Sequence, residues 1–358
     1  MSIFQPTNNI INLEKTNTVK IKGGNRLKGI VNSQGSKNAA LPVLASLILV
    51  PKAKIYNVPN LSDIREMIRI LNYLGAECQL KNGVLYYDGK DVENKVINSE
   101  FTNKMRASSL FLGPLLSKFG SSSVGMPGGC VIGSRPLDIH MEGFKSLGAN
   151  HTLDHGLIHI DNTSISGKYI LPFPSVGATQ NLISSAVFCK DKVILQNVAI
   201  EPEVIELIDF LNKAGAKITL NPDKSIEIKG VKKLRSVDFS IQPDRIEVFT
   251  ILAAAVASKG EVKVFNCNPQ HLQAPLSKLR DMGVHIKTGR NWIKATYRFP
   301  LQGIKVKTGV YPSFPTDCQQ QISALMLQST SPSLLIETIF NSRFKHLEEY
   351  RKLGAEIK

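Results

Sequence analysis

The chain has 358 residues, too many for one ordinary hydrophobic core, so two domains are expected. Apolar residues make up 42% and charged residues 20%, which excludes disorder as the main state. The net charge of +15 suits an anionic partner. Because the basic residues are scattered and aromatic residues make up only 7%, the composition favours a phosphorylated small molecule over nucleic acid.

The sequence contains no segment typical of a membrane helix or a secretory signal. The longest apolar run, residues 39–50, contains Pro42 and is shorter than the roughly 20 residues that a membrane helix needs. Residues 1–20 lack an apolar signal region, so a cytoplasmic protein is expected. The 5 cysteines include no C-x-x-C pair, which disfavours a disulfide framework or a zinc site.

In chain order, segments with helical periodicity that end at Leu-Gly-Ala or a near copy recur through the sequence. Helices are predicted at 62–74, 202–214 and 272–282, each before a glycine suited to the left-handed position after a helix. Strands are predicted before them at 54–58, 193–198 and 262–266, and after the glycines at 84–87, 157–160, 226–229 and 292–295. The repeat glycines are Gly75, Gly148, Gly215, Gly283 and Gly354. This spacing of about 70 residues predicts repeated α/β units.

A second helix in each unit is apolar nearly all round, which predicts buried helices with sheets wrapped around them. The polar starts of these helices recur in step with the glycines. They are marked by Asn38, Arg106, Ala178, Arg245 and Asp317. Helix N-termini carry unpaired N–H groups and a positive dipole end, so a converging set of them predicts an anion site. An ordinary helix cap is the alternative for any one of them.

Five ordered motifs resemble one family. They are residues 34–41 (QGSKNAAL), 104–108 (KMRAS), 127–136 (PGGCVIGSRP), 243–247 (PDRIE) and 314–317 (FPTD). Together they resemble UDP-N-acetylglucosamine 1-carboxyvinyltransferase, from about Val19 to the last residue. The resemblance implies an α/β fold of two inside-out barrel domains built from pseudo-repeats. The implied domains are 37–242, and 1–36 together with 243–358.

The resemblance also implies the reaction. Enzymes of this family transfer the enolpyruvyl group of phosphoenolpyruvate to the 3-hydroxyl of UDP-N-acetylglucosamine and release phosphate, in the first committed step of peptidoglycan synthesis. The implied setting is the cytoplasm, with roles in cell wall formation, cell shape and cell division. The implied partners are the two small-molecule substrates, without nucleic acid or membrane. The reaction uses no metal and no cofactor.

Substrate-binding residues follow from the resemblance, position by position. Lys37 matches a contact to phosphoenolpyruvate and Asn38 a contact to the UDP-sugar, while Arg106 matches a substrate-binding arginine. The remaining matches are a nucleotide-holding stretch, a substrate-binding turn and a backbone contact to the UDP-sugar. They comprise Arg135, Pro136, Leu137, Asp138, Ile139, Ser175, Val176, Gly177 and Ile339. Phe173 departs from the pattern, because some relatives have lysine there.

Three residues are expected to be catalytic: Lys37, Cys130 and Asp317. Cys130 lies in the glycine-rich segment 120–133, which predicts a loop, and it matches a general acid toward the methylene carbon of phosphoenolpyruvate. Asp317 matches the carboxylate that handles the proton of the attacking hydroxyl, with a helix cap as its alternative role. The other four cysteines are expected to be small buried residues.

Three alternatives stay open. His151, His155 and His159 have a spacing that could bind a metal on a helix, but Gly156 and the alternation around it favour a hairpin. Five units of an expected six are present, because residues 355–358 end where the next hairpin is expected to begin. One rival function is therefore that of a truncated, inactive relative that binds a UDP-sugar or a partner. A shikimate 3-phosphate enolpyruvyl transferase is the other, disfavoured by the Pro-Gly-Gly-Cys segment.

Overall fold

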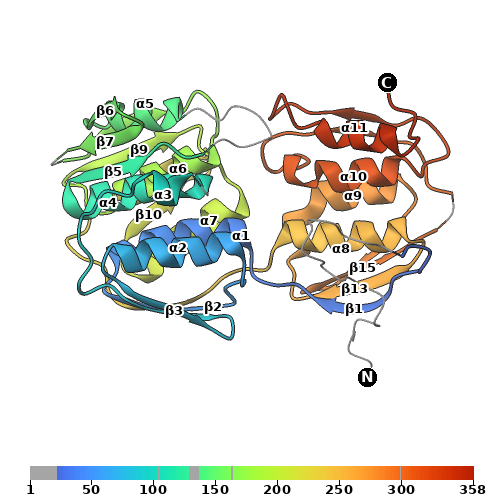
Figure 1. The fold of residues 1–358 in the computed structure, drawn as a ribbon, viewed down its shortest axis with the longest axis horizontal. Coiled ribbons are helices and arrows are strands. Elements are labelled where there is room, and N and C mark those ends of the chain that lie inside the picture. Colours follow the sequence, from blue (N-terminus) through green and yellow to red (C-terminus); the bar gives the residue numbers. More distant parts are fainter. Residues whose placement is uncertain (1–21, 104, 129–136, 163, 299) are drawn as a thin grey trace. The chain divides into compact units, whose positions relative to one another are not determined.

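The computed structural model describes residues 22–103, 105–128, 137–162, 164–298 and 300–358 (Figure 1). Internal contacts divide the chain into two compact units. Unit 1 contains the described residues up to Gln34, then Pro243–Ile339 and Phe344–Lys358. Unit 2 contains Gly35–Gln242 and the short segment Phe340–Arg343.

Unit 2 is built around three short helices that are buried nearly all round. They are α1 (Lys37–Ser46), α4 (Leu112–Phe119), which follows the 3₁₀ helix η2 (Arg106–Phe111), and α6 (Val176–Ser185). Polar side chains join them, since the Asn181 side chain accepts from Gly113 N–H at 2.9 Å and donates to Ser109 O at 3.1 Å. Each buried leucine, isoleucine or phenylalanine stabilises this core by roughly 1.5–3 kcal/mol. The predicted buried helices are therefore confirmed in unit 2.

The described residues of unit 2 form three sheets, with strand orders β12-β2-β4-β3, β10-β11-β9-β8 and β5-β7-β6. In Figure 1 the first of them lies beneath α1 and α2. The strands are β2 (Lys52–Tyr56), β3 (Glu77–Lys81), β4 (Val84–Asp88), β5 (Ser121–Gly125), β6 (Asn150–Asp154), β7 (Leu157–Asp161), β8 (Gly167–Ile170), β9 (Lys192–Gln196), β10 (Lys217–Leu220), β11 (Ile226–Lys229) and β12 (Val237–Ser240). The other helices are η1 (Leu47–Leu49), α2 (Ser62–Tyr73), α3 (Ser99–Thr102), α5 (Asp138–Ser146) and α7 (Pro202–Lys213).

Unit 1 repeats this design with helix α8 (Arg245–Ala257) over the sheet β1-β13-β15-β14. Phe249 on α8 is fully buried and meets Phe314 edge to face, with ring centroids 6.0 Å apart. The strands are β1 (Lys28–Asn32), β13 (Glu261–Phe265), β14 (His285–Thr288), β15 (Trp292–Thr296), β16 (Lys305–Lys307) and β17 (Leu334–Ile336). The other helices are η3 (Pro269–Leu272), α9 (Gln273–Asp281), η4 (Thr316–Cys318), α10 (Gln319–Met326) and α11 (Lys345–Lys352).

The repeat glycines have the left-handed backbone that the sequence predicts, with φ between 89° and 108° at all five. Such a φ strains any residue with a Cβ, so glycine ends each helix there. The histidine segment is a hairpin, because β6 and β7 pair antiparallel around a turn at His155 and Gly156. The hairpin prediction is confirmed, and the three histidines do not share a helix face.

None of the helices in the described part of the chain is both long enough and apolar enough to cross a membrane.

Candidate active site

The start of α1 presents two of the predicted substrate-binding residues. Ser36 caps the helix, because its Oγ accepts from Ala39 N–H at 3.3 Å. Lys37 and Asn38 follow in the first turn and are half-buried. The Lys37 Nζ lies 3.1 Å from the carboxylate of Asp63, a residue of the α2 first turn that the sequence did not single out. The Lys37 ammonium group is paired with one carboxylate at this helix N-terminus, and it can also form an ion pair with a bound phosphate.

His140 gathers three other predicted site residues of unit 2. Its side chain is 6% exposed, and a Cβ on Gly177 would lie only 3.2 Å from its Nε2. Burial, and then the charge of Arg106, lower the pKa of His140 to about 4, although Asp138 and the Gly177 backbone act in the opposite direction. The imidazole is therefore neutral at pH 7. Sequence reasoning missed His140, although it directly follows the predicted stretch that ends at Ile139.

These neighbours lie at the starts of separate elements. Arg106 begins η2, Asp138 begins α5, and Gly177 lies in the first turn of α6. Ser175 caps α6, since its Oγ accepts from Ala178 N–H at 3.4 Å. Of the adjacent predicted residues, Leu137 is buried, whereas Ile139 and Val176 are half-buried. The fold thus brings three N-terminal ends around one histidine, which is an arrangement suited to an anion.

Cys130, Arg135 and Pro136 lie outside the described residues, so their predicted roles stay predictions. Phe173, where some relatives have lysine, is 41% exposed, and its carbonyl accepts from Ser175 N–H at 2.7 Å.

In unit 1 a glutamate joins the segments that carry Asp317 and Ile339. The carboxylate of Glu337 accepts from Thr316 Oγ1 at 2.8 Å and from Ile339 N–H at 2.7 Å. Asp317 lies inside η4, and Pro315 occupies the cap position. The cap position of η4 thus falls at Pro315, two residues before Asp317. Glu337 was not predicted, because nothing in its local sequence marks a bond to a residue 21 positions away.

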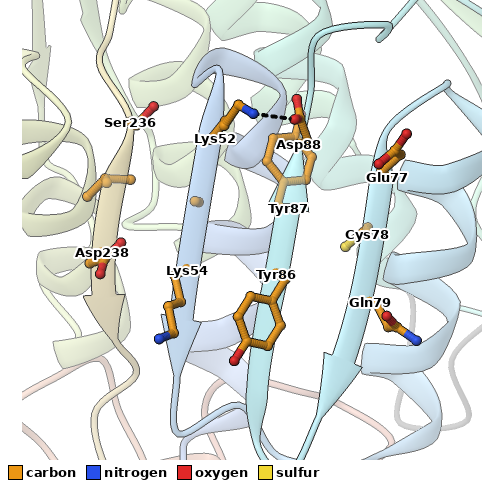
Figure 2. Close-up of a pocket in the computed structure, with 12 residues that line it drawn as sticks. Lys52, Lys54, Glu77, Cys78, Gln79, Tyr86, Tyr87, Asp88, Ser236 and Asp238 are labelled. Carbon is orange, nitrogen blue, oxygen red and sulfur yellow. Dashed lines mark ion pairs between the residues drawn. The ribbon is translucent and has the colours of Figure 1, made fainter.

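A surface groove of about 440 Å³ lies over the sheet β12-β2-β4-β3 and contains none of the predicted site residues (Figure 2). Lys52 and Asp88 form an ion pair of 2.7 Å across its strands. The Lys54 Nζ lies 5.6 Å from the ring centroid of Tyr86, which is 46% exposed. This groove lies on an open sheet face and is not lined by the helix N-termini found around His140.

Solved structures share this fold. The enolpyruvyl transferase NikO from Streptomyces tendae aligns with a TM-score of 0.82 at 19% identity, covering 92% of this chain and 79% of that one. The chain thus has the enolpyruvyl transferase fold, as the sequence predicts.

Sequence comparison identifies the family. The model of EPSP synthase (3-phosphoshikimate 1-carboxyvinyltransferase) matches residues 21–358. A UDP-N-acetylglucosamine 1-carboxyvinyltransferase from Halothermothrix orenii is 41% identical over 340 residues, which are 94% of this chain and 82% of that protein. Another from Staphylococcus epidermidis is 41% identical over 346 residues, which are 95% and 82% of the two chains. The chain belongs to the UDP-N-acetylglucosamine 1-carboxyvinyltransferases, within the wider EPSP synthase family of enolpyruvyl transferases.

Proposed function

We propose that this protein transfers the enolpyruvyl group of phosphoenolpyruvate to the 3-hydroxyl of UDP-N-acetylglucosamine and releases phosphate. The observation that carries the proposal is the set of helix N-termini around His140, with Arg106, Asp138 and Gly177 at their first turns. The names of the relatives at 41% identity support the choice of substrates. The two units are proposed to be the two enolpyruvyl transferase domains.

In this proposal different polar and charged side chains bind the two substrates. Lys37 meets the phosphate of phosphoenolpyruvate, while Asn38 and Arg106 bind the UDP-sugar side. Residues 135–139, the turn 175–177 and the Ile339 backbone hold the nucleotide sugar. Asp317 takes the proton of the attacking hydroxyl, and Cys130 supplies a proton to the methylene carbon. The reaction would be the first committed step of peptidoglycan synthesis, in the cytoplasm, and would serve cell wall formation, cell shape and cell division.

A phosphate-release assay tests the substrates. Phosphoenolpyruvate with UDP-N-acetylglucosamine is expected to release phosphate, whereas phosphoenolpyruvate with shikimate 3-phosphate is not. Release only with shikimate 3-phosphate would favour the other branch of the family. No release with either acceptor, from protein that still binds the UDP-sugar by calorimetry, would identify an inactive binding relative.

Lys37→Ala is expected to weaken phosphoenolpyruvate binding by about 1.5–3 kcal/mol, because a charge-assisted hydrogen bond is lost. Isothermal titration of both proteins measures the difference. Lys52→Ala is the matched control. Lys52 also pairs with an aspartate, at 2.7 Å, but it lies on the sheet β12-β2-β4-β3, away from the predicted site residues. Equal affinity of wild type and Lys37→Ala would place Lys37 outside the phosphate site.

Cys130 is expected to be the thiol that a small electrophile modifies first at neutral pH. The other four cysteines are buried, and burial raises the pKa of Cys267 to about 11 and that of Cys78 to about 12. A thiol with a raised pKa holds little reactive thiolate at pH 7. Mass spectrometry after brief alkylation locates the label. Faster labelling of Cys78 or Cys267 than of Cys130 would contradict the prediction.

A further inference from the structure

The chain passes between the units through two short segments, a first crossover at residues 34–36 and a second crossover at residues 242–244. Each follows an edge strand that pairs in parallel with a strand of its own unit: β1 with β13, and β12 with β2. Ser36 N–H donates to the Gln242 carbonyl at 2.8 Å, a bond inside unit 2. The residue that caps α1 therefore depends on the position of the second crossover.

A buried carboxyl group also binds the second crossover, through the N–H of Gln242. Glu206 on α7 is 5% exposed, and its Oε1 accepts from Gln242 N–H at 2.7 Å. Its Oε2 is buried without a hydrogen-bond partner among the described residues. Burial raises the pKa of Glu206 to about 8. A neutral carboxyl with one accepting oxygen on a backbone N–H is thus the form expected at pH 7.

Unit 1 holds its own crossover in a similar way. The Glu247 carboxylate accepts from Gln34 N–H at 2.7 Å, and the Gln34 carbonyl accepts from Asp244 N–H at 2.9 Å. Asp244 in turn caps α8. In each unit, therefore, a glutamate fixes a crossover glutamine whose carbonyl fixes the cap of an internal helix. The same order of bonds occurs in both units, which indicates that the arrangement is a structural feature of the repeat and not a chance contact.

We propose that Glu206 is a positioning residue, which holds the start of α1 through Gln242 and Ser36. The relay runs from the Glu206 Oε1 to the Gln242 N–H, and from the Gln242 carbonyl to the Ser36 N–H. The N–H and the carbonyl of Gln242 belong to adjacent peptide units that share its Cα, so a displacement of Gln242 shifts both bonds. Lys37 and Asn38 directly follow Ser36. The effect on substrate binding rests on the proposed function, whereas the relay itself does not.

Three single variants of the full chain test the relay. Glu206→Ala removes the acceptor. Glu206→Gln keeps an accepting oxygen and resembles the neutral acid. Asp209→Ala, on the same helix, removes an exposed carboxylate that is not bonded to the crossover in the described residues. The direct readout is amide hydrogen exchange in the segment 241–244, where Pro243 contributes no amide, and the second readout is the pair of KM values and kcat.

Glu206→Ala is expected to speed exchange of the Gln242 amide and to raise KM by about 10-fold, the effect of losing one buried hydrogen bond, with a smaller change in kcat. Glu206→Gln and Asp209→Ala should stay within about 3-fold of wild type in both readouts. If Glu206→Ala does not fold, Glu206→Gln still has to behave as wild type.

Unchanged exchange in Glu206→Ala, or a glutamine variant as impaired as the alanine variant, would overturn the relay. Fast exchange with unchanged KM would overturn the positioning role. A wild-type protein that turns over neither substrate would count against the proposed function alone, because amide exchange still reports the relay.

Discussion

Asp317→Asn is expected to lower turnover by about 10²–10⁴-fold, the usual contribution of a positioned general base. Asparagine has a similar shape but cannot take the proton of the attacking hydroxyl. Asp317 lies in the first turn of η4, and the side chain of the neighbouring Thr316 donates to Glu337 at 2.8 Å, which ties this turn to a residue outside the helix.

The measurement is kcat from phosphate release with both substrates at saturation, together with a thermal melt. Asp281→Asn is the control, because Asp281 is an exposed carboxylate of unit 1 that pairs with Lys278 at 2.9 Å. The melt should be unchanged in both variants. A kcat of Asp317→Asn within about threefold of wild type would show that Asp317 is not the base.

Gly35→Ala is expected to reduce both stability and substrate binding. A Cβ at Gly35 would lie 1.7 Å from the Asn57 carbonyl oxygen, so backbone atoms must move. Forced shifts of this kind cost about 1–3 kcal/mol of folding free energy. Gly35 lies in the first crossover, directly before Ser36, which caps α1, and Lys37, which begins it. A shift of about 1 Å at a binding group can lower kcat/KM by roughly 10²-fold.

Thermal unfolding and kcat/KM together measure this effect. Gly23→Ala is the matched control, because a Cβ there meets no atom within 4 Å. We expect Gly23→Ala to be neutral in both measurements. A Gly35→Ala protein with wild-type stability and kcat/KM would show that the crossover can relax without moving the start of α1.

The repeat and its elements could be predicted from the sequence because their signals are local. The helix predicted at 202–214 is observed at Pro202–Lys213, and the strand predicted at 226–229 is observed at Ile226–Lys229. A helix that ends at a left-handed glycine needs only the residues of its last turn to specify it. The apolar pattern of residues 37–46 likewise marks a helix buried on every side, whatever surrounds it.

The candidate site could be predicted only in part. Lys37, Asn38, Arg106 and Asp317 were found through motifs, and the structure places each at the start of an internal helical element. His140 was missed, because a lone histidine in a helix is more often a packed core residue than a site residue. Glu337 was missed because its bonds to Thr316 and Ile339 form only once a distant strand end has been brought to the helix.

The sequence by itself therefore determined the α/β repeat, the buried helices, the family and the residue types of the site. Only the tertiary structure decided which segments meet. The parallel pairing of β12 with β2 and of β1 with β13 joins strands more than 180 residues apart. The bonds from Glu206 and Glu247 to the crossovers depend on that pairing. Such contacts are set by packing between distant segments, and no local pattern of residues encodes them.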